Sequence, residues 1–155
     1  MADPENTLII ETTQGRVVIE LRPDLAPNHV ARIKELAREG FYDGIVFHRV
    51  IDGFMAQTGC PNGSGTGGSK LPNLKAEFNA EPHVRGVCSM ARAASPDSAN
   101  SQFFICFDDA TFLDRKYTVW GKVVEGMENV DKIKRGEPVQ NPDKMISVKV
   151  AADAA

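Results

Sequence analysis

The sequence predicts a mainly β fold, a closed β-barrel capped by two α-helices. Short apolar segments bounded by turn residues recur along the chain, which is typical of strands, and only two stretches carry apolar residues at helical spacing. Closing such strands into a barrel would leave no exposed edge. The expected strands are two within residues 8–21, joined by a tight turn, and one each at 46–50, 54–58, 84–90, 102–106, 119–124 and 146–150.

Each of the two expected helices has one apolar face. The first begins at Pro27, a residue favoured in the first helical turn, and ends at Gly40. Its apolar residues share one face (Val30, Ile33, Leu36 and Ala37). The second helix is shorter and ends before Gly136, with an apolar face made of Met127, Val130 and Ile133.

Length and composition limit the class of protein. With 155 residues, 42% of them hydrophobic, the chain suits one domain over residues 1–155, with frayed ends at 1–5 and 151–155. A net charge of −3 gives no basic footprint for nucleic acid or for an anionic membrane. The sequence shows no secretory signal and no apolar run near the roughly 20 residues that span a bilayer.

The cysteines argue against a metal site and for a reducing compartment. Cys60, Cys88 and Cys106 are odd in number and widely spaced, and they form no Cys-x-x-Cys pair. No histidine lies near them at metal-ligand spacing, so we expect no metal and no cofactor. Cys88 and Cys106 lie in apolar runs and are expected in the core. The prediction is a cytoplasmic protein.

Residues 59–69 break the pattern of strands, because they are rich in Gly, Ser, Asn and Thr and must form a loop. Gly63, Gly65 and Gly68 satisfy the pattern G-x-G-x-x-G of dinucleotide-binding proteins. That motif needs a helix directly after it, and residues 70–73 (Lys-Leu-Pro-Asn) would break one. We therefore expect a flexible glycine turn and no nucleotide.

Two runs, residues 47–57 and 101–106, contain the candidate functional residues. Arg49 is placed on an expected strand between apolar neighbours, where it could face a site or simply face solvent. Four apolar residues could likewise line a pocket or belong to an ordinary core (Phe54, Met55, Phe104 and Leu113). The pattern alone leaves both alternatives open.

Several motifs in the same order resemble those of the cyclophilins. They are Phe-His-Arg-Val-Ile-Asp-Gly-Phe-Met-Ala-Gln at 47–57, Gly-Thr-Gly-Gly at 65–68, Ser-Met-Ala at 89–91, Ser-Gln-Phe-Phe-Ile at 101–105, Phe-Leu-Asp at 112–114 and Trp-Gly-Lys-Val at 120–123. The likeness extends from residue 7 to residue 150. It implies an eight-stranded antiparallel barrel with two helices, and a peptidyl-prolyl cis-trans isomerase that assists protein folding.

The resemblance also implies roles for individual residues. The arginine that matches Arg49 is the catalytic residue of cyclophilins. The pocket for the proline ring corresponds to Phe54, Met55, Phe104 and Leu113. The remaining substrate-binding positions correspond to Gln57, Gly65, Ala91, Arg92, Ala93, Gln102, Phe112 and Tyr117.

At three positions the sequence differs from many eukaryotic cyclophilins, and its overall pattern resembles the shorter bacterial members. Phe112 replaces a tryptophan, so an indole N–H donor is missing. Tyr117 replaces a histidine and Arg92 an asparagine. None of these changes removes the catalytic position, but the loss at Phe112 predicts weaker binding of cyclosporin-type ligands.

The implied reaction suits a site without a nucleophile, a metal or a cofactor. Rotation about an X-Pro bond makes and breaks no covalent bond, but it disrupts amide resonance at a barrier of about 18–20 kcal/mol. A guanidinium could donate to the prolyl nitrogen, which becomes a better acceptor in the twisted amide. Ser101 and His48 form no recognisable triad, and His48 is expected to be structural.

Two other functions remain possible at the level of sequence. The chain could be a binding module that recognises proline without turnover, although ring burial alone needs no Arg49. A β-barrel that binds nucleic acid is the weakest alternative, because no basic patch is evident. The expected partners are proline-containing polypeptides, and the expected state is a monomer.

Overall fold

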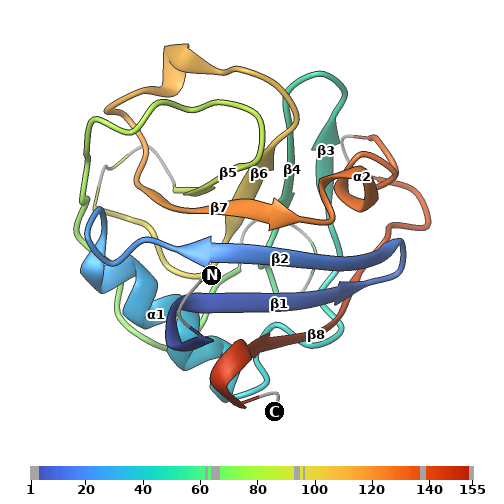
Figure 1. The fold of residues 1–155 in the computed structure, drawn as a ribbon, viewed down its shortest axis with the longest axis horizontal. Coiled ribbons are helices and arrows are strands. Elements are labelled where there is room, and N and C mark those ends of the chain that lie inside the picture. Colours follow the sequence, from blue (N-terminus) through green and yellow to red (C-terminus); the bar gives the residue numbers. More distant parts are fainter. Residues whose placement is uncertain are drawn as a thin grey trace.

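The computed structural model describes residues 4–61, 63, 67–92, 95, 97–136 and 139–153. Eight strands and two α-helices account for most of the regular structure (Figure 1). The strands are β1 (Thr7–Thr12), β2 (Gly15–Leu21), β3 (Arg49–Ile51), β4 (Met55–Thr58), β5 (Val87–Met90), β6 (Phe103–Cys106), β7 (Val119–Glu125) and β8 (Met145–Val150). The α-helices are α1 (Pro27–Arg38) and α2 (Met127–Val130), and short 3-10 helices cover Pro4–Asn6, Thr111–Leu113 and Ala151–Asp153.

All eight strands belong to one antiparallel sheet, in the order β3-β4-β6-β5-β7-β2-β1-β8. Each of the strands expected from the sequence is found, and the mainly β fold is confirmed. Figure 1 shows α1 and α2 at opposite ends of the curled sheet.

The prediction of a fully closed barrel was overstated. The terminal strands β3 and β8 share no ladder, and the gap is spanned by backbone bonds from the segments that precede them. An isolated bridge joins Val46 to Lys144, and Phe47 N–H donates to the Asp143 carbonyl at 2.8 Å. Because isolated backbone hydrogen bonds join these segments in place of a ladder, the sheet curls almost into a barrel but does not close completely.

Two expected elements are shorter in the structure. The strand predicted at 46–50 is reduced to β3, because the chain before Arg49 bonds to the 139–145 connection instead of to a strand. The helix predicted over 127–133 has only four α-helical residues in α2. Tighter i→i+3 bonds then continue the turn, from Lys132 N–H to Asn129 and from Ile133 N–H to Val130.

Strand register divides the apolar residues of the sheet between two faces. Because successive side chains alternate, residues opposite one another across the ladder share a face. One row runs across β3, β4, β6 and β5 through Val50, Ala56, Ile105 and Cys88, and all four belong to the main core. The neighbouring residues face the other way, where Met55, Phe104, Cys106, Ala110 and Leu113 form a second, smaller cluster.

Helix α1 packs into the main core and is capped at both ends. Its first turn has no side-chain cap of its own, but the Glu77 carboxylate accepts from the N–H groups of Asn28 at 3.2 Å and His29 at 2.8 Å. At its other end Gly40, at φ +73°, lets the N–H of Phe41 reach the Leu36 carbonyl at 3.0 Å. Glu77 therefore ties the long connection between β4 and β5 to the helix.

That connection is held mainly by polar contacts. Arg32, from α1, donates to the Pro72 carbonyl at 2.6 Å, and Asn100 donates to the Leu71 carbonyl at 2.9 Å. At its start Gly59 has φ +93°, and a side chain there would collide with the Ser101 carbonyl. These contacts bring residues 67–76 beside the start of β6.

Candidate functional site

The smaller apolar cluster forms the floor of a hollow of about 140 Å³. Strands β3, β4 and β6, the segment after β5 and the turn after Thr111 all contribute to its wall. Nine of the residues expected in a peptide site line it (Arg49, Phe54, Met55, Gln57, Ala91, Arg92, Phe104, Leu113 and Tyr117). Below, this space is called the apolar hollow.

Arg49 reaches this hollow because of the strand register. It pairs with Gln57 across β3 and β4, and Gln57 pairs with Phe104 across β4 and β6, so the three side chains share one face. The Arg49 Nη1 donates to Gln57 Oε1 at 3.1 Å. The sequence left open whether this arginine faces solvent, and the structure places it in the wall of the hollow beside Phe104.

A chain of side-chain amides continues from Arg49. Gln57 Nε2 donates to Gln102 Oε1 at 2.9 Å, and Gln102 Nε2 donates to the Gly67 carbonyl at 2.9 Å. Each amide uses its acceptor toward Arg49 and its donor toward the loop, so the orientation of both glutamines is defined. The chain fixes the guanidinium relative to the apolar floor.

A second hollow, of about 620 Å³, adjoins the first and is polar. Gln57, Ala91 and Arg92 line both spaces. The remaining lining residues of the larger space, called the polar hollow below, are Gly67, Gly68, Ser69, Asn73, Ser98, Asn100, Ser101 and Gln102. The two together form a surface that can hold an extended peptide, with one apolar side chain inserted.

Aromatic rings form the rim of the apolar hollow. The Tyr117 ring meets Phe104 edge-on at 5.8 Å, and the Arg92 guanidinium lies 4.6 Å from the centre of the Tyr117 ring. Phe112 lies 5.6 Å from Phe54, but it is 64% exposed and does not line the hollow. Of the expected substrate-binding residues, Gly65 and Ala93 lie outside the described residues.

Sequence reasoning missed the support behind Phe104. His83 is fully buried and its ring stacks on Phe104 at 6.2 Å. Its Nε2 lies 2.9 Å from Ser89 Oγ on β5, and its Nδ1 lies 3.1 Å from the Asp114 carboxylate beside Leu113. One imidazole thus contacts Phe104 on β6, Ser89 on β5 and Asp114 after the Thr111–Leu113 turn, a set of partners that spacing along the chain could not reveal.

The charges of this support follow from its surroundings. Burial lowers the pKa of His83, although the Asp114 carboxylate opposes that shift. The pKa of Asp114 is lowered, first by the hydrogen bond from the His83 backbone N–H and then by the ring. A neutral imidazole beside an ionised carboxylate is therefore the arrangement expected near neutral pH.

The hydrogen bonds of His83 to Ser89 and Asp114 have the order of those in a hydrolytic triad, but a substrate cannot reach them. Both Ser89 and His83 have no exposed surface, so no substrate carbonyl can reach the serine hydroxyl. Ser101, considered from the sequence, donates to the Gly59 carbonyl at 2.8 Å and is equally buried. Both serines act as structural hydrogen-bonding groups.

The cysteines are unsuited to nucleophilic chemistry. All three are buried, and none is in a disulfide bond. Burial raises the pKa of Cys106 to about 12 and also raises that of Cys88, so both stay protonated at neutral pH. Both lie in the core, as expected.

The structure also bears on the alternative functions. The described residues contain no cluster of three or more His, Cys, Asp or Glu that could hold a metal ion. No helix follows the glycine loop in residues 67–86, so the dinucleotide motif lacks its required context. In the part of the chain that the structure covers, no helix has the length and apolarity to cross a membrane.

Solved structures share this architecture over nearly the whole chain. A cyclophilin from Hirschia baltica superposes with a TM-score of 0.92 at 35% identity, covering 99% of this chain and 77% of that one. A cyclophilin-type isomerase from Cryptosporidium parvum, crystallised in the presence of the dipeptide Ala-Pro, gives 0.86 at 26% identity, covering 93% and 98%. The fold and the arginine-walled hollow therefore define a protein of the cyclophilin class.

Sequence comparison gives the same result. Residues 7–151 match the family described as cyclophilin type peptidyl-prolyl cis-trans isomerase/CLD. A probable peptidyl-prolyl cis-trans isomerase of Brucella suis is 56% identical over 98% of this chain and 86% of its own length, and one from Synechococcus elongatus is 42% identical over 95% and 97%. The chain belongs to the cyclophilin family and is a peptidyl-prolyl cis-trans isomerase.

Proposed function

We propose that Arg49 is the catalytic residue and that the apolar hollow holds the proline ring of the substrate. The observation that carries this proposal is a guanidinium in the wall of a small space whose other walls include Phe54, Met55, Phe104 and Leu113. A pyrrolidine ring is apolar and rigid, and such a space removes it from water without leaving a polar group unpaired.

The guanidinium stabilises the twisted amide more than either planar form. As resonance is lost, the prolyl nitrogen regains its lone pair and accepts a hydrogen bond that it could not accept before. One charge-assisted hydrogen bond contributes about 1.5–3 kcal/mol, which corresponds to roughly one to two powers of ten in rate. The Gln57 contact holds the guanidinium in place before the substrate arrives, so little reorganisation is needed.

The substrate chain extends from the apolar hollow into the polar one. Gln57 and Gln102 offer amide groups there, and the backbone beside Ala91 lies within reach of both spaces. With the ring inserted on one side of the bond and the chain held on the other, rotation is confined to the X-Pro bond. The substrates are proline-containing segments of polypeptide clients, whose folding the enzyme assists.

An exchange assay on an Ala-Pro peptide tests the role of Arg49. Arg49→Ala should reduce kcat/KM by about ten- to a hundredfold, and Arg49→Lys should also lose activity because an ammonium lacks the planar fork. Arg16→Ala, on the exposed β1–β2 hairpin, is the matched control and should keep full activity. If Arg49→Ala matched the wild type, Arg49 would have no part in the mechanism.

Three further properties are part of the proposal. The single continuous sheet and core support one domain over residues 1–155, and we expect a monomer in light scattering.

Three buried cysteines without a disulfide bond support a reducing, cytoplasmic location, which cell fractionation would test. Phe112 supports weak binding of cyclosporin-type ligands, because a phenyl ring offers no N–H donor; Phe112→Trp should tighten that binding in calorimetry.

A further inference from the structure

The polar hollow has two walls that come from separate parts of the chain. One wall is the segment 67–73 of the β4–β5 connection, and the other is the segment 98–102 before β6. An isolated bridge joins the two segments beside the hollow, where the Leu74 N–H donates to the Ala99 carbonyl at 2.7 Å. Because loops shift more easily than strands, the width of this hollow depends on the side chains that hold both walls.

Arg32 holds both walls from behind. It belongs to α1, is only 7% exposed and lines neither hollow. Its Nη2 donates to the Pro72 carbonyl in the first wall at 2.6 Å, and its Nη1 donates to the Asn100 carbonyl in the second wall at 3.3 Å. The guanidinium is planar and rigid, so its two donors set the distance between these carbonyls.

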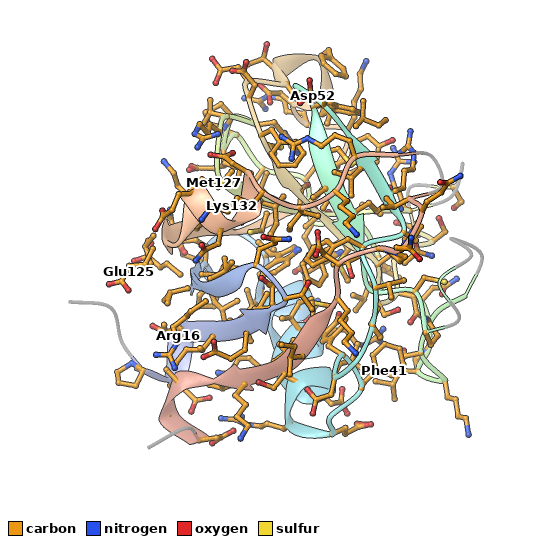
Figure 2. All side chains as sticks on the ribbon, turned by 90° about the vertical axis from the view of Figure 1, so that its right-hand side faces the viewer. Arg16, Phe41, Asp52, Glu125, Met127 and Lys132 are labelled. Atoms are coloured by element: carbon orange, nitrogen blue, oxygen red, sulfur yellow. The ribbon has the colours of Figure 1, made fainter. Side chains whose placement is uncertain are left out.

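The chain just after α1 gives the second wall a further support. Tyr42 is fully buried, and its hydroxyl donates to the Ser101 carbonyl at 2.8 Å. Arg32 and Tyr42 therefore hold two consecutive carbonyls of this wall. Figure 2 shows this part of the chain, marked by Phe41, at the opposite end of the view from the β3–β4 turn, marked by Asp52. The support from α1 is thus remote from the turn that borders the apolar hollow.

Asn100 extends the contact between the walls on the inside of the hollow. Its Oδ1 accepts from the Ser69 N–H at 2.8 Å, and its Nδ2 donates to the Leu71 carbonyl at 2.9 Å and to Asn73 Oδ1 at 3.1 Å. Arg32 binds the backbone carbonyl of the same residue. The Asn100 side chain can hold the first wall only while its own backbone is fixed, and Arg32 contributes to fixing it.

We infer that Arg32 is a positioning residue for substrate binding, because it keeps the two walls of the polar hollow at the separation in which an extended peptide can contact both. The inference rests on the proposed path of the substrate from the apolar hollow into the polar one. Walls that are already ordered lose less conformational entropy when the peptide binds. Loss of the Arg32 donors should therefore weaken binding of the chain beyond the proline more than it slows rotation about the X-Pro bond.

Peptide length separates this role from a general loss of structure. A blocked Ala-Pro peptide occupies mainly the apolar hollow, whereas about three added residues, roughly 10 Å of extended chain, reach into the polar hollow. One peptide is extended before the alanine and another after the proline. In the wild type, the extension that enters the polar hollow should lower KM relative to Ala-Pro. Exchange rates over a range of peptide concentrations give KM and kcat for each peptide.

Arg32→Met removes both donors and keeps an apolar side chain. KM for the peptide that enters the polar hollow should rise about three- to tenfold more than KM for Ala-Pro, the range of one or two hydrogen bonds, while kcat changes less. Arg32→Lys should have an intermediate effect, because its ammonium lacks the fork that reaches both carbonyls, and it carries the test if Arg32→Met does not fold. Arg38→Met is the matched control on the same helix: Arg38 pairs with Glu5 and Asp153 at the surface, and the ratio of the two KM values should match the wild type.

The same measurements distinguish failure of this inference from failure of the proposed function. An equal rise of KM for Ala-Pro and for the extended peptide, or no rise for either, overturns the inference alone. If neither extension lowers KM in the wild type, the proposed path into the polar hollow is wrong, and the inference with it. The role of Arg49 is judged separately, by the rate of Arg49→Ala on Ala-Pro. Thermal unfolding of each Arg32 variant checks that a changed KM belongs to a folded protein.

Discussion

The two hollows of the cleft adjoin each other but are stabilised in different ways. The apolar hollow is floored by residues from paired strands, such as Met55 and Phe104, which are almost completely buried. The polar hollow is bounded largely by loop residues such as Ser69, whose backbone N–H and hydroxyl both donate to Asn100 Oδ1. Because apolar burial couples the first hollow to global folding, we expect the second to open while the sheet remains intact.

The largest effect is expected at the floor of the apolar hollow. Phe104→Ala should lower the free energy of unfolding by about 3–5 kcal/mol, because it removes a ring from a packed site. Phe112→Ala, a matched substitution at a ring that is 64% exposed, should cost less than about 0.5 kcal/mol. Denaturant unfolding of the two variants gives the comparison, and equal losses would show that the hollow is not coupled to the core.

A smaller effect, of about 1–2 kcal/mol, is expected from Asn100→Ala in the polar hollow. Asn100 Oδ1 accepts from the Ser69 N–H at 2.8 Å, and its Nδ2 donates to the Leu71 carbonyl at 2.9 Å. Water can replace part of these bonds, so hydrogen exchange should increase at the Ser69 amide with little change in the strands. Asn100→Asp is the matched variant, since it keeps the acceptor for Ser69 and loses the donor to Leu71. Increased exchange throughout the strands in Asn100→Ala would contradict the separation of the two hollows.

The third comparison concerns pH and the support behind the apolar hollow. Burial lowers the pKa of His83, His29 and His48, so the unfolded chain binds more protons than the folded one below about pH 6.5. The free energy of unfolding should therefore not depend on these histidines above that pH. Below it, the free energy of unfolding should fall by at most about 1.4 kcal/mol per pH unit for each histidine.

His83→Gln measures how much the imidazole behind Phe104 contributes to the pH dependence of stability. The variant should show a shallower loss of stability between about pH 6.5 and 4.5, since one of the three proton-linked groups is gone. Denaturant unfolding at a series of pH values measures the slope. A slope identical to that of the wild type would show that His83 is not held neutral by burial.

Much of the fold could be predicted because it is encoded by neighbouring residues. The alternation in β1 and β2, the proline that opens α1 and the glycine that follows it are local patterns with local causes. The ends of elements were less predictable. The strand before Arg49 was shortened because its backbone bonded to the 139–145 connection, a partner almost a hundred residues away.

Most residues of the apolar hollow were predicted through the cyclophilin motifs, not through periodicity. Phe103 and Phe104 are adjacent and both buried, yet Phe103 belongs to the main core and Phe104 to the hollow. An apolar run with both faces covered carries no visible alternation, so the pattern could not separate the two rings. The role of His83 was missed because its partners, Ser89 and Asp114, are united with it only by the fold.

By itself the sequence determined the type and order of the elements and the family to which the chain belongs, because both are written in contiguous residues. The tertiary structure decided which face of each strand turns toward the hollow, how far the sheet closes and which charges meet at the cleft. Those features depend on strand register and on contacts between distant segments, and a shift of one residue would turn Arg49 to the opposite face of the sheet.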